Sequence, residues 1–371
     1  MAPFDLIVVG AGIVGLAHAL AAARRGLAVA VVERDTRAMS ASVRNFGFVT
    51  VSGQADGDTR RRALRSREVW AEVTDAAGIE VLQRGAVVVA RREEALAVLE
   101  EFAAGSMGEG CEVWNARDAA SRIPGLRADC RGALASPHEL RVEAREALPR
   151  IARWLEERHG VRFLWGTAAL AIEATALRHD SGTLEARAIV IAPGTGLAAF
   201  APALAAEARL RQCKLQMMRV AGVQARLASV VMTDLSLARY EGFAAQPSAA
   251  RLLARLEREC AAQLAHGVHL IVAQSADGTL VVGDSHHYGD DADPFASAEV
   301  EALILDELSK LFDFPAATVV ERWIGHYAVA DVKPLVSRPL GPRVRAVTVT
   351  SGTGMSTAFA IGEETIGELF G

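Results

Sequence analysis

The chain has 371 residues, of which 51% are hydrophobic and 23% are charged, and its formal net charge is −5. A chain of this length forms one or two domains, each large enough to bury its own core. The small negative charge provides no electrostatic footprint for a nucleic acid or an anionic membrane. No uncharged run reaches the ~18 residues that a membrane-spanning helix needs. The composition thus argues against nucleic-acid-binding and membrane-spanning proteins and indicates an ordinary globular protein.

The four cysteines are scattered, without a C-x-x-C pair or a neighbouring histidine pattern, at Cys111, Cys130, Cys213 and Cys260. Such cysteines are typical of free, buried thiols in a reducing compartment. The chain enters its first predicted strand at Phe4, which leaves no room for the charged and apolar regions of a signal peptide. We therefore expect a cytoplasmic protein.

A short apolar strand, Phe4–Val9, opens the chain and leads directly into the glycine-rich segment Gly10–Gly15, which reads GAGIVG. An alanine-rich helix that stops at Gly26 and a second apolar run at residues 28–32 follow. In this pattern the first glycine permits a tight turn and the second lets backbone amides approach a pyrophosphate. The third glycine lets the helix pack close to the strand. The order strand, loop, helix and strand predicts a dinucleotide-binding unit.

Glu33 ends the second apolar run and narrows the choice of dinucleotide. The free N–H groups and the dipole at a helix N-terminus suit a diphosphate, and a carboxylate after the second strand can accept hydrogen bonds from an adenosine ribose. The same carboxylate would repel a 2′-phosphate, so FAD or NAD is favoured over NADP. The alternative is a doubly wound domain whose glycines serve only turn geometry, which leaves the position of Glu33 unexplained.

The next segments alternate between predicted helices and strands. They are a charged helix over 58–77, a strand over 85–90, helices over 93–103 and 149–159, and strands over 161–165 and 188–192. In the helix over 93–103, the apolar residues Ala95, Val98, Leu99 and Phe102 recur at helical spacing. The strand over 188–192 runs into Pro193 and Gly194, which is a second passage from a strand into a glycine loop.

From Leu210 to about residue 316 the pattern changes to strand-like alternation, as in Leu280–Gly283, with one long helix over 248–264. This pattern predicts a separate, largely antiparallel layer. A strand over 344–349 then leads into the glycine-rich segment 352–357 and a final helix over 358–369. Passages from a strand into a glycine loop thus occur at the start, middle and end of the chain. They predict a discontinuous nucleotide domain with the other layer inserted into it.

The order of these motifs resembles the D-amino-acid oxidase superfamily, which includes glycine oxidase and sarcosine oxidase. The residues that carry the resemblance are Gly10–Gly15 with Glu33, Ser42–Gly47, Ala192–Gly194 and Gly352–Thr357. The resemblance implies an α/β fold with a glutathione-reductase-like, FAD-binding Rossmann domain and an inserted antiparallel substrate domain. By position, the FAD domain would comprise residues 1–80, 138–208 and 320–371, and the substrate domain residues 81–137 and 209–319.

The resemblance also implies FAD as the cofactor, and it is expected to be noncovalent because no cysteine falls near Arg44–Phe46 or Trp323–Asp331. Gly352–Thr357 opens a helix, whose free amides and dipole can face the region of the flavin where negative charge accumulates on reduction. The residues expected to bind FAD are Gly10, Ala11, Gly12, Ile13, Val14, Gly15, Glu33, Arg34, Arg44, Asn45, Phe46, Ala169, Pro193, Gly194, Gly352, Thr353, Gly354, Met355, Ser356 and Thr357.

Enzymes of this superfamily transfer a hydride from an amine-bearing carbon to the flavin, and water hydrolyses the resulting imine. Oxygen then reoxidises the flavin, usually with release of hydrogen peroxide. The resemblance therefore implies oxidative deamination or N-dealkylation of a small amine. The alternatives are an FAD-dependent dehydrogenase with another electron acceptor, an NAD-dependent dehydrogenase, which fits only the first motif, and a non-catalytic flavin-binding protein.

The segment Trp323–Ala328 departs from the W-x-G-x-R-P motif of many amino-acid oxidases, whose arginine clamps the substrate carboxylate. Alignment on Trp323 puts Tyr327 at the arginine position, whereas alignment on Asp331 puts His326 there. Either the substrate lacks an α-carboxylate, or its acid group is held from elsewhere. We expect a changed head group, because a single arginine gives most of the specificity for a carboxylate.

Other polar residues are candidates for the substrate site. The candidate catalytic residues are His326, Tyr327 and Lys214, and the candidate substrate ligands are His286, Tyr288 and Arg141. Lys214 could favour oxygen activation near the flavin, or it could be an exposed strand lysine. Arg141 could meet an anionic group, or it could form a structural ion pair.

The histidine-rich segment 283–291 makes a poor metal site, because no further histidine or cysteine follows at ligand spacing, and we expect no metal. Adjacent histidines on an extended chain point to opposite sides, so at most one of the pair 286–287 should face a ligand. Together with Ser136–Val142, the segment Gly283–His286 resembles a subgroup associated with aminophosphonate breakdown. The expected substrate is therefore an aminoalkylphosphonate or an N-methylated amine.

Overall fold

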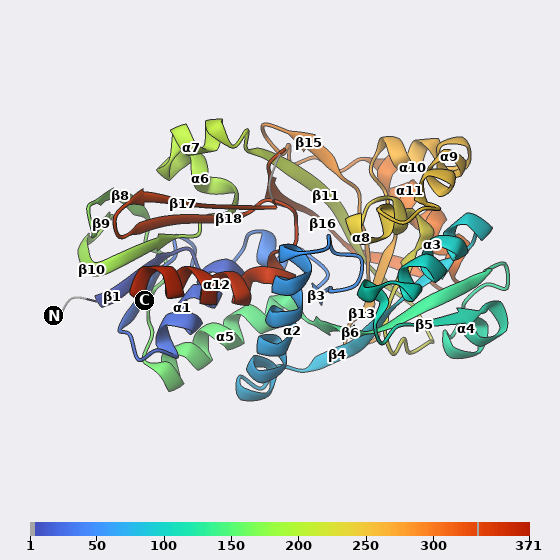
Figure 1. Cartoon of the computed structure of the whole chain (residues 1–371), viewed down its shortest axis with the longest axis horizontal. Coiled ribbons are helices and arrows are strands. Elements are labelled where there is room, and N and C mark those ends of the chain that lie inside the picture. Colours follow the sequence, from blue (N-terminus) through green and yellow to red (C-terminus); the bar gives the residue numbers. More distant parts are fainter. Residues whose placement is uncertain (1–3, 332–333) are drawn as a thin grey trace.

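Two large β-sheets, of eight and ten strands, form the framework of the computed structural model, which describes residues 4–331 and 334–371. Figure 1 shows the two sheets towards opposite ends of the long axis, with helices packed against them. The architecture is the predicted combination of an α/β layer with a second, largely antiparallel layer.

The eight-stranded sheet has the strand order β17-β18-β10-β1-β2-β7, and the hairpin β8–β9 is attached to β10. Its strands are β1 (Phe4–Val9), β2 (Val29–Val32), β7 (Arg162–Leu164), β8 (Ala169–Glu173), β9 (Ala176–His179), β10 (Gly182–Ile191), β17 (Leu335–Gly341) and β18 (Val344–Val349). β1 runs parallel to β2 and β10, and β10 runs parallel to β18. The neighbours β18, β10 and β1 therefore end at the same edge, which brings the three glycine loops together.

Four helices share one hydrophobic core with β1: α1 (Ile13–Ala23), α2 (Asp58–Ala76), α5 (Ala144–His159) and α12 (Gly354–Phe370). Trp70 of α2 is fully buried, and its ring lies 5.2 Å from the ring of Phe359 in an edge-on contact. Its Nε1 donates a hydrogen bond of 2.7 Å to the carbonyl oxygen of Met355. These contacts attach α2 to α12 and hold the first turn of α12 in place.

Helices α1 and α12 approach closely at Gly362, where an added Cβ would lie 2.8 Å from the carbonyl group of Ala17. Replacing Gly362 with alanine is expected to lower the free energy of unfolding by about 1–3 kcal/mol, because overpacking forces the helices apart. Gly367 on the same helix is the matched control, since its added Cβ would lie 3.7 Å from the nearest atom, in Arg25.

Alanine at Gly367 is expected to stabilise the protein by up to ~1 kcal/mol, because alanine favours the helix more than glycine does. Denaturant unfolding of both variants measures the two effects. Equal changes in the free energy of unfolding would contradict a special role for the close approach of α1 and α12.

The ten-stranded sheet has the order β15-β11-β14-β13-β12-β4-β6-β3, with β16 paired to β11 and β5 paired to β6. Its strands are β3 (Phe48–Val49), β4 (Val81–Ala90), β5 (Glu112–Asn115), β6 (Gly132–Val142), β11 (Arg211–Ala221), β12 (Val230–Thr233), β13 (Ile271–Gln274), β14 (Leu280–Gly283), β15 (His287–Gly289) and β16 (Thr318–Val329). β12 pairs in parallel with β4, whereas β11 is antiparallel to β14, β15 and β16. This sheet is the predicted, largely antiparallel layer.

The remaining helices are mostly short. They are α3 (Glu93–Ala104), α4 (Ala116–Arg122), α6 (Leu197–Phe200), α7 (Pro202–Glu207), α8 (Glu241–Ala244), α9 (Ala249–Glu259), α10 (Ala261–Ala265) and α11 (Ala298–Leu311), with the 3-10 helices η1 (Ala41–Val43), η2 (Ser106–Gly108), η3 (Gly194–Gly196) and η4 (Asp234–Ala238). The helix predicted over 248–264 is divided into α9 and α10 at Cys260. No helix in the described ranges combines the length and apolar character that a membrane crossing requires.

The proposed domain boundaries remain a prediction, because strand pairing by itself does not define domains. The pairing nevertheless places three predicted FAD-domain segments in the ten-stranded sheet, the first of which is β3. Residues 138–142 belong to β6, and residues 320–329 belong to β16, which pairs with β11 from Arg211 to Ala221. The residues predicted to form the FAD domain therefore lie in both sheets.

Candidate active site

A cavity of about 990 Å³ lies where the glycine-loop edge of the eight-stranded sheet meets the ten-stranded sheet. One end of its lining comes from the loops that follow β1, β10 and β18. The other end comes from β16, from the segment after η4 and from the connection between β14 and β15. A large cavity bordered by several elements with convergent polar groups is the first candidate for a ligand site.

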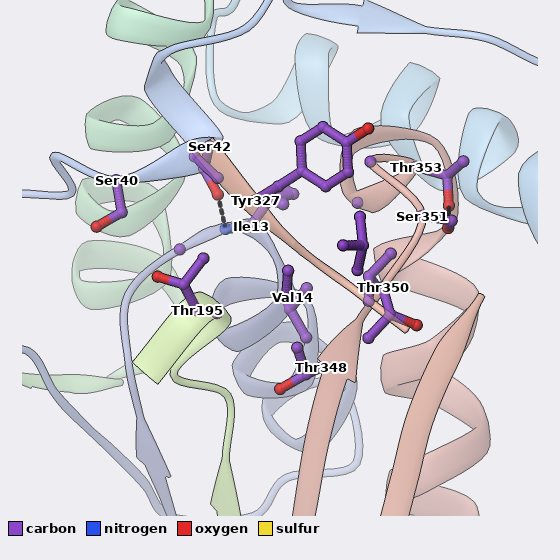
Figure 2. A pocket seen from close by; sticks show the side chains of 18 of the residues that line it. Ile13, Val14, Ser40, Ser42, Thr195, Tyr327, Thr348, Thr350, Ser351 and Thr353 are labelled. Atoms are coloured by element: carbon purple, nitrogen blue, oxygen red, sulfur yellow. Dashed lines mark hydrogen bonds between the residues drawn. The ribbon is translucent and has the colours of Figure 1, made fainter. Parts of the chain in front are cut away.

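Two long helices begin at this cavity. Gly12 and Ile13 at the start of α1 line it, as does Gly354 at the start of α12. Figure 2 shows the backbone N–H of Ile13 donating to the hydroxyl of Ser42, with an N···O distance of 3.0 Å. Helix N-termini carry free N–H groups and a positive dipole end, so this part of the cavity favours anionic groups such as a diphosphate.

Glu33 lies at the end of β2 and is fixed against the glycine loop. One carboxylate oxygen accepts a hydrogen bond from the backbone N–H of Ala11 (2.8 Å), and the other accepts one from the backbone N–H of Asp35 (3.1 Å). Its side chain lines the cavity beside Arg34. This is the position expected of a carboxylate that accepts hydrogen bonds from a ribose.

Most of the predicted cofactor residues line this one cavity: Gly10, Gly12, Ile13, Val14, Glu33, Arg34, Arg44, Asn45, Phe46, Ala169, Pro193, Gly194, Gly352, Thr353, Gly354, Met355 and Ser356. Three others do not line it. The backbone N–H of Ala11 donates to the carboxylate of Glu33, and the hydroxyl of Thr357 donates to the carbonyl oxygen of Thr353. An added Cβ on Gly15 would meet the carbonyl group of Gly10. These three residues contact the protein around the cavity loops and not the cavity itself.

The two residues that replace the missing arginine both line the cavity. Figure 2 shows Tyr327 near the loop that carries Ser351 and Thr353. Burial raises the pKa of Tyr327 well above its ordinary value, so its hydroxyl stays protonated and can donate a hydrogen bond. Burial, followed by the positive charges of Arg44 and Arg34, lowers the pKa of His326, so its imidazole is neutral at pH 7.

Arg239, which the sequence analysis did not identify, supplies a guanidinium to the same end of the cavity. It follows η4, and it donates hydrogen bonds to the hydroxyls of Tyr288 (3.0 Å) and Tyr327 (3.1 Å). Tyr288 and His286, both predicted, also line the cavity. Nothing in the local sequence distinguishes this arginine from the many others, because it reaches the site only through the folding of the second sheet.

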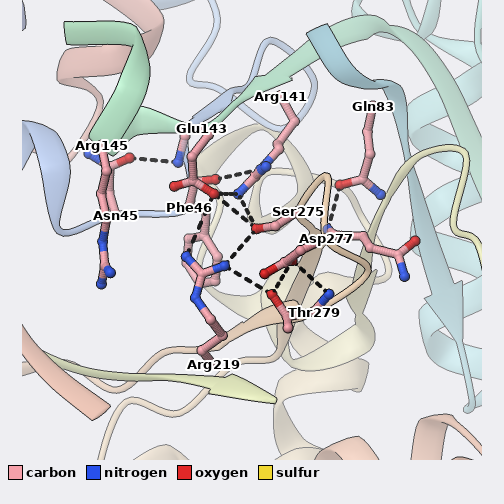
Figure 3. Close-up of polar contacts among 12 residues, drawn as sticks. Asn45, Phe46, Gln83, Arg141, Glu143, Arg145, Arg219, Ser275, Asp277 and Thr279 are labelled. Atoms are coloured by element: carbon pink, nitrogen blue, oxygen red, sulfur yellow. Dashed lines mark hydrogen bonds and ion pairs between the residues drawn. The ribbon is translucent and has the colours of Figure 1, made fainter. Parts of the chain in front are cut away.

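Lys214 and Arg141 lie outside the cavity lining. The ammonium group of Lys214 is 2.7 Å from a carboxylate oxygen of Asp293. Arg141 is buried, with its guanidinium 3.1 Å from a carboxylate oxygen of Glu143 and 3.2 Å from the hydroxyl of Ser275. Figure 3 shows these contacts. Both cations thus have protein partners, and Arg141 has the structural ion pair that was the alternative at the sequence level.

Three buried residues form a second polar group at the cavity wall. The side chains of His269, Asp284 and His286 present ligand atoms that lie within 4.8 Å of one another, a spacing that a metal ion could use. Arg239 acts electrostatically on all three, and its charge contributes to lowering the pKa values of both histidines after the larger effect of burial. A permanent cation so close disfavours a divalent metal, so the expectation of no metal is retained as a prediction.

The fold and the cavity define a flavoenzyme: the chain belongs to the DAO family of FAD-dependent oxidoreductases, whose model matches residues 5–367. FAD is therefore its cofactor, and the choice between FAD and NAD that the first motif left open falls to FAD. Glu33, the glycine loops and the two helix N-termini fit this cofactor. The resemblance drawn from the sequence is confirmed at the level of the superfamily.

Among curated proteins, the chain is 33% identical to one of the subunits of opine oxidase from Rhizobium meliloti over 145 residues, which cover 35% of this chain and 39% of that protein. The match thus spans about two fifths of that relative. Among solved structures, glycine oxidase from Bacillus cereus ATCC 14579 has a TM-score of 0.79 at 17% identity, covering 99% of this chain and 94% of that one. L-proline dehydrogenase from P. horikoshii has a TM-score of 0.78 at 18% identity, with 97% and 91% covered. These structures confirm the predicted fold.

Proposed function

We propose that this flavoprotein oxidises a small amine with an anionic head group, by oxidative deamination or N-dealkylation. Bound FAD supplies the acceptor for the hydride that leaves the amine-bearing carbon. Water then hydrolyses the imine product, and the electrons pass to oxygen, which yields hydrogen peroxide. The proposed substrate is an aminoalkylphosphonate or an N-methylated amine, and the proposed compartment is the cytoplasm.

The proposal rests on one observation, the set of hydrogen-bond partners of Arg239. Within residues 4–331 and 334–371, its hydrogen-bond partners are the hydroxyls of Tyr288 and Tyr327, and it forms no ion pair with a carboxylate. A guanidinium with neutral partners keeps its charge available for an anion. Of the two explanations for the departure at Trp323–Ala328, this favours an acid group held from another element. The expectation of a changed head group then rests on the donors around Arg239 and no longer on the missing arginine.

The hydrogen-bond donors around Arg239 support a phosphonate over a plain carboxylate. The guanidinium and the hydroxyls of Tyr288 and Tyr327 meet at one place on the cavity wall. A phosphonate has three oxygens and more negative charge than a carboxylate, so it can use more of these donors. A carboxylate would leave some of the donors without a charged partner.

Anaerobic mixing of the purified holoenzyme with a panel of amines tests the proposal. The panel contains glycine, sarcosine, D-alanine and aminoalkylphosphonates, and bleaching of the yellow flavin absorbance reports reduction. We expect fast bleaching by an acid-bearing amine and slow bleaching by the same amine without its acid group. A flavin that no amine bleaches would end the proposal and favour a non-catalytic flavin-binding protein.

The electron acceptor is measured separately. Peroxide formed per substrate consumed, with and without an artificial dye acceptor, distinguishes an oxidase from a dehydrogenase. We expect one peroxide per substrate in air. Turnover that requires the dye would assign the dehydrogenase alternative and would leave the proposed amine chemistry intact.

A further inference from the structure

Asp284 is a buried carboxyl group on the wall of the cavity, directly after β14. Its residue is 5% exposed, and its backbone exchanges two hydrogen bonds with that of His269, at 3.0 and 3.2 Å. Its Oδ1 atom has no hydrogen-bond partner among the described residues. Such an atom is costly to bury unless a ligand or a proton satisfies it.

His286 presents a lone pair, rather than an N–H group, to this carboxyl group. His286 Nδ1 lies 2.9 Å from the carbonyl oxygen of Gly267, which can only accept, so Nδ1 carries the hydrogen of the neutral ring. The bare Nε2 of His286 then lies 3.7 Å from Oδ2 of Asp284. His269 Nε2 lies 3.2 Å from Oδ1 without hydrogen-bond geometry, while its Nδ1 contacts the hydroxyl of Ser236 at 3.0 Å.

Besides Asp284, one other carboxyl group among the described residues, that of Glu139, acts electrostatically on this cluster, through Tyr240. Cys213, Tyr240 and Tyr327 interact with the cluster, and burial raises the pKa of each, so all three are neutral at pH 7. Arg239 is the nearby cation. Burial raises the pKa of Asp284 itself to about 7, although Arg239 and a backbone hydrogen bond act in the opposite direction.

We infer that Asp284 binds the ammonium group of the substrate and accepts one of its protons, while Arg239 holds the acid group. The two side chains are the complementary charges of a zwitterion, and both line one cavity. His269 and His286 are positioning residues, whose Nε2 atoms lie 3.2 Å from Oδ1 and 3.7 Å from Oδ2 of Asp284. The inference rests on the proposed amine oxidation.

The proton transfer is needed because an ammonium nitrogen has no lone pair to assist the departure of a hydride. One N–H bond of the ammonium breaks, its electron pair stays on nitrogen, and a new O–H bond forms on Asp284. The neutral amine can then lose its hydride to FAD. The proton on Asp284 returns to solvent after the product leaves.

Replacement of Asp284 with asparagine tests this role. In the wild type, kcat/KM should fall as the pH drops below about 7, because Asp284 becomes protonated and can no longer accept a proton. In the variant this acid limb of the pH profile, the fall in kcat/KM below about pH 7, should disappear. Its activity should instead follow the ionisation of the substrate amine itself. Flavin bleaching at pH 7 should slow by roughly 10²-fold or more, as expected for loss of a general base.

A binding measurement separates this role from a structural one. Ethylphosphonate, which lacks an amine, is titrated against the absorbance spectrum of the bound flavin. Asp284→Asn should bind this anion at least as tightly as the wild type, since a nearby negative charge is removed. A loss of both FAD and anion binding in a folded variant would indicate a structural role and overturn the inference.

Asp234 provides a matched control, because its carboxyl group is also buried but lies outside the cavity lining, 2.9 Å from the guanidinium of Arg92. Asp234→Asn should keep the limb near pH 7. An Asp284→Asn variant with an unchanged limb would overturn the inference, as would a stoichiometric divalent metal bound by His269, Asp284 and His286. A wild type without the limb would overturn it even if the variant failed to fold. A wild type that no amine reduces would instead contradict the proposed function.

Discussion

Replacement of Arg239 with methionine is expected to lower kcat/KM for an acid-bearing amine by roughly 10²–10³-fold, which corresponds to about 3–4 kcal/mol. The guanidinium donates to Tyr288 and Tyr327 and brings the positive charge to this end of the cavity. Without it, the acid group of the substrate would be desolvated with only neutral donors. Most of the loss should appear in KM if the acid group is held equally in the bound substrate and in the transition state.

Arg239→Lys should recover only part of this loss, because an ammonium is a point charge and cannot reproduce the planar fork that reaches both phenols. An amine without an acid group should lose little activity in either variant. Steady-state kinetics with a matched pair of amines, one with and one without the acid group, measures this difference. Equal losses for the two amines would mean that Arg239 does not recognise the acid group.

Arg219 is the matched control for the loss of an internal arginine. It lies on β11 and donates to the hydroxyls of Ser275 (3.0 Å) and Thr279 (2.9 Å), as Figure 3 shows. It does not line the cavity. Arg219→Met should lower the free energy of unfolding and leave the ratio of the kcat/KM values for the two amines unchanged. This result would separate anion recognition from general destabilisation.

The nucleotide-binding half of the site could be predicted from sequence because local patterns define it. Each of its three loops follows directly from a buried strand, and parallel strands end at a common edge of the sheet. Gly10–Gly15, Pro193–Gly194 and Gly352–Ser356 therefore had to meet once the sheet order was given. The same reasoning located Glu33, because its place at the end of β2 is also set by parallel pairing with β1.

The substrate half could not be predicted in the same way. Arg239 comes from a short segment after η4, and Asp284 from the end of an antiparallel strand, and they meet only in the folded second sheet. The pair 286–287 does separate as an extended chain requires, since His286 lines the cavity and His287 contacts His266 instead. The alternation alone did not predict which of the two histidines would face the cavity.

The prediction also missed α11, and the cause is a pattern that was available. Val300, Ile304, Leu308 and Leu311 are buried along one face of this helix, at spacings of three and four residues. The surrounding strand-like sequence outweighed this periodicity in our interpretation. The error did not affect the site, because α11 packs in a separate core with Met218 and Val220 of β11.

Replacement of Gly15 with alanine is expected to produce a colourless protein, because this position has no space for a side chain. An added Cβ would lie 1.8 Å from the carbonyl oxygen of Gly10 and 3.3 Å from a methyl carbon of Val8. Helix α1 would have to move away from β1, and the loop between them would move with it. The N–H groups of that loop would then no longer converge on the diphosphate. We expect FAD to bind at least roughly 10²-fold more weakly, a loss of about 3 kcal/mol.

Gly105→Ala is the control for this change, because its added Cβ would lie 3.5 Å from the nearest atom, which is an ordinary contact. The ratio of flavin to protein absorbance after purification, followed by titration with FAD, measures occupancy and affinity. Circular dichroism separates a folded apoprotein from an unfolded chain. A folded Gly15→Ala variant that retains stoichiometric FAD would show that the close packing of α1 on β1 is not required for the diphosphate site. The glycine pattern would then reflect turn geometry alone, which was the alternative interpretation of this motif.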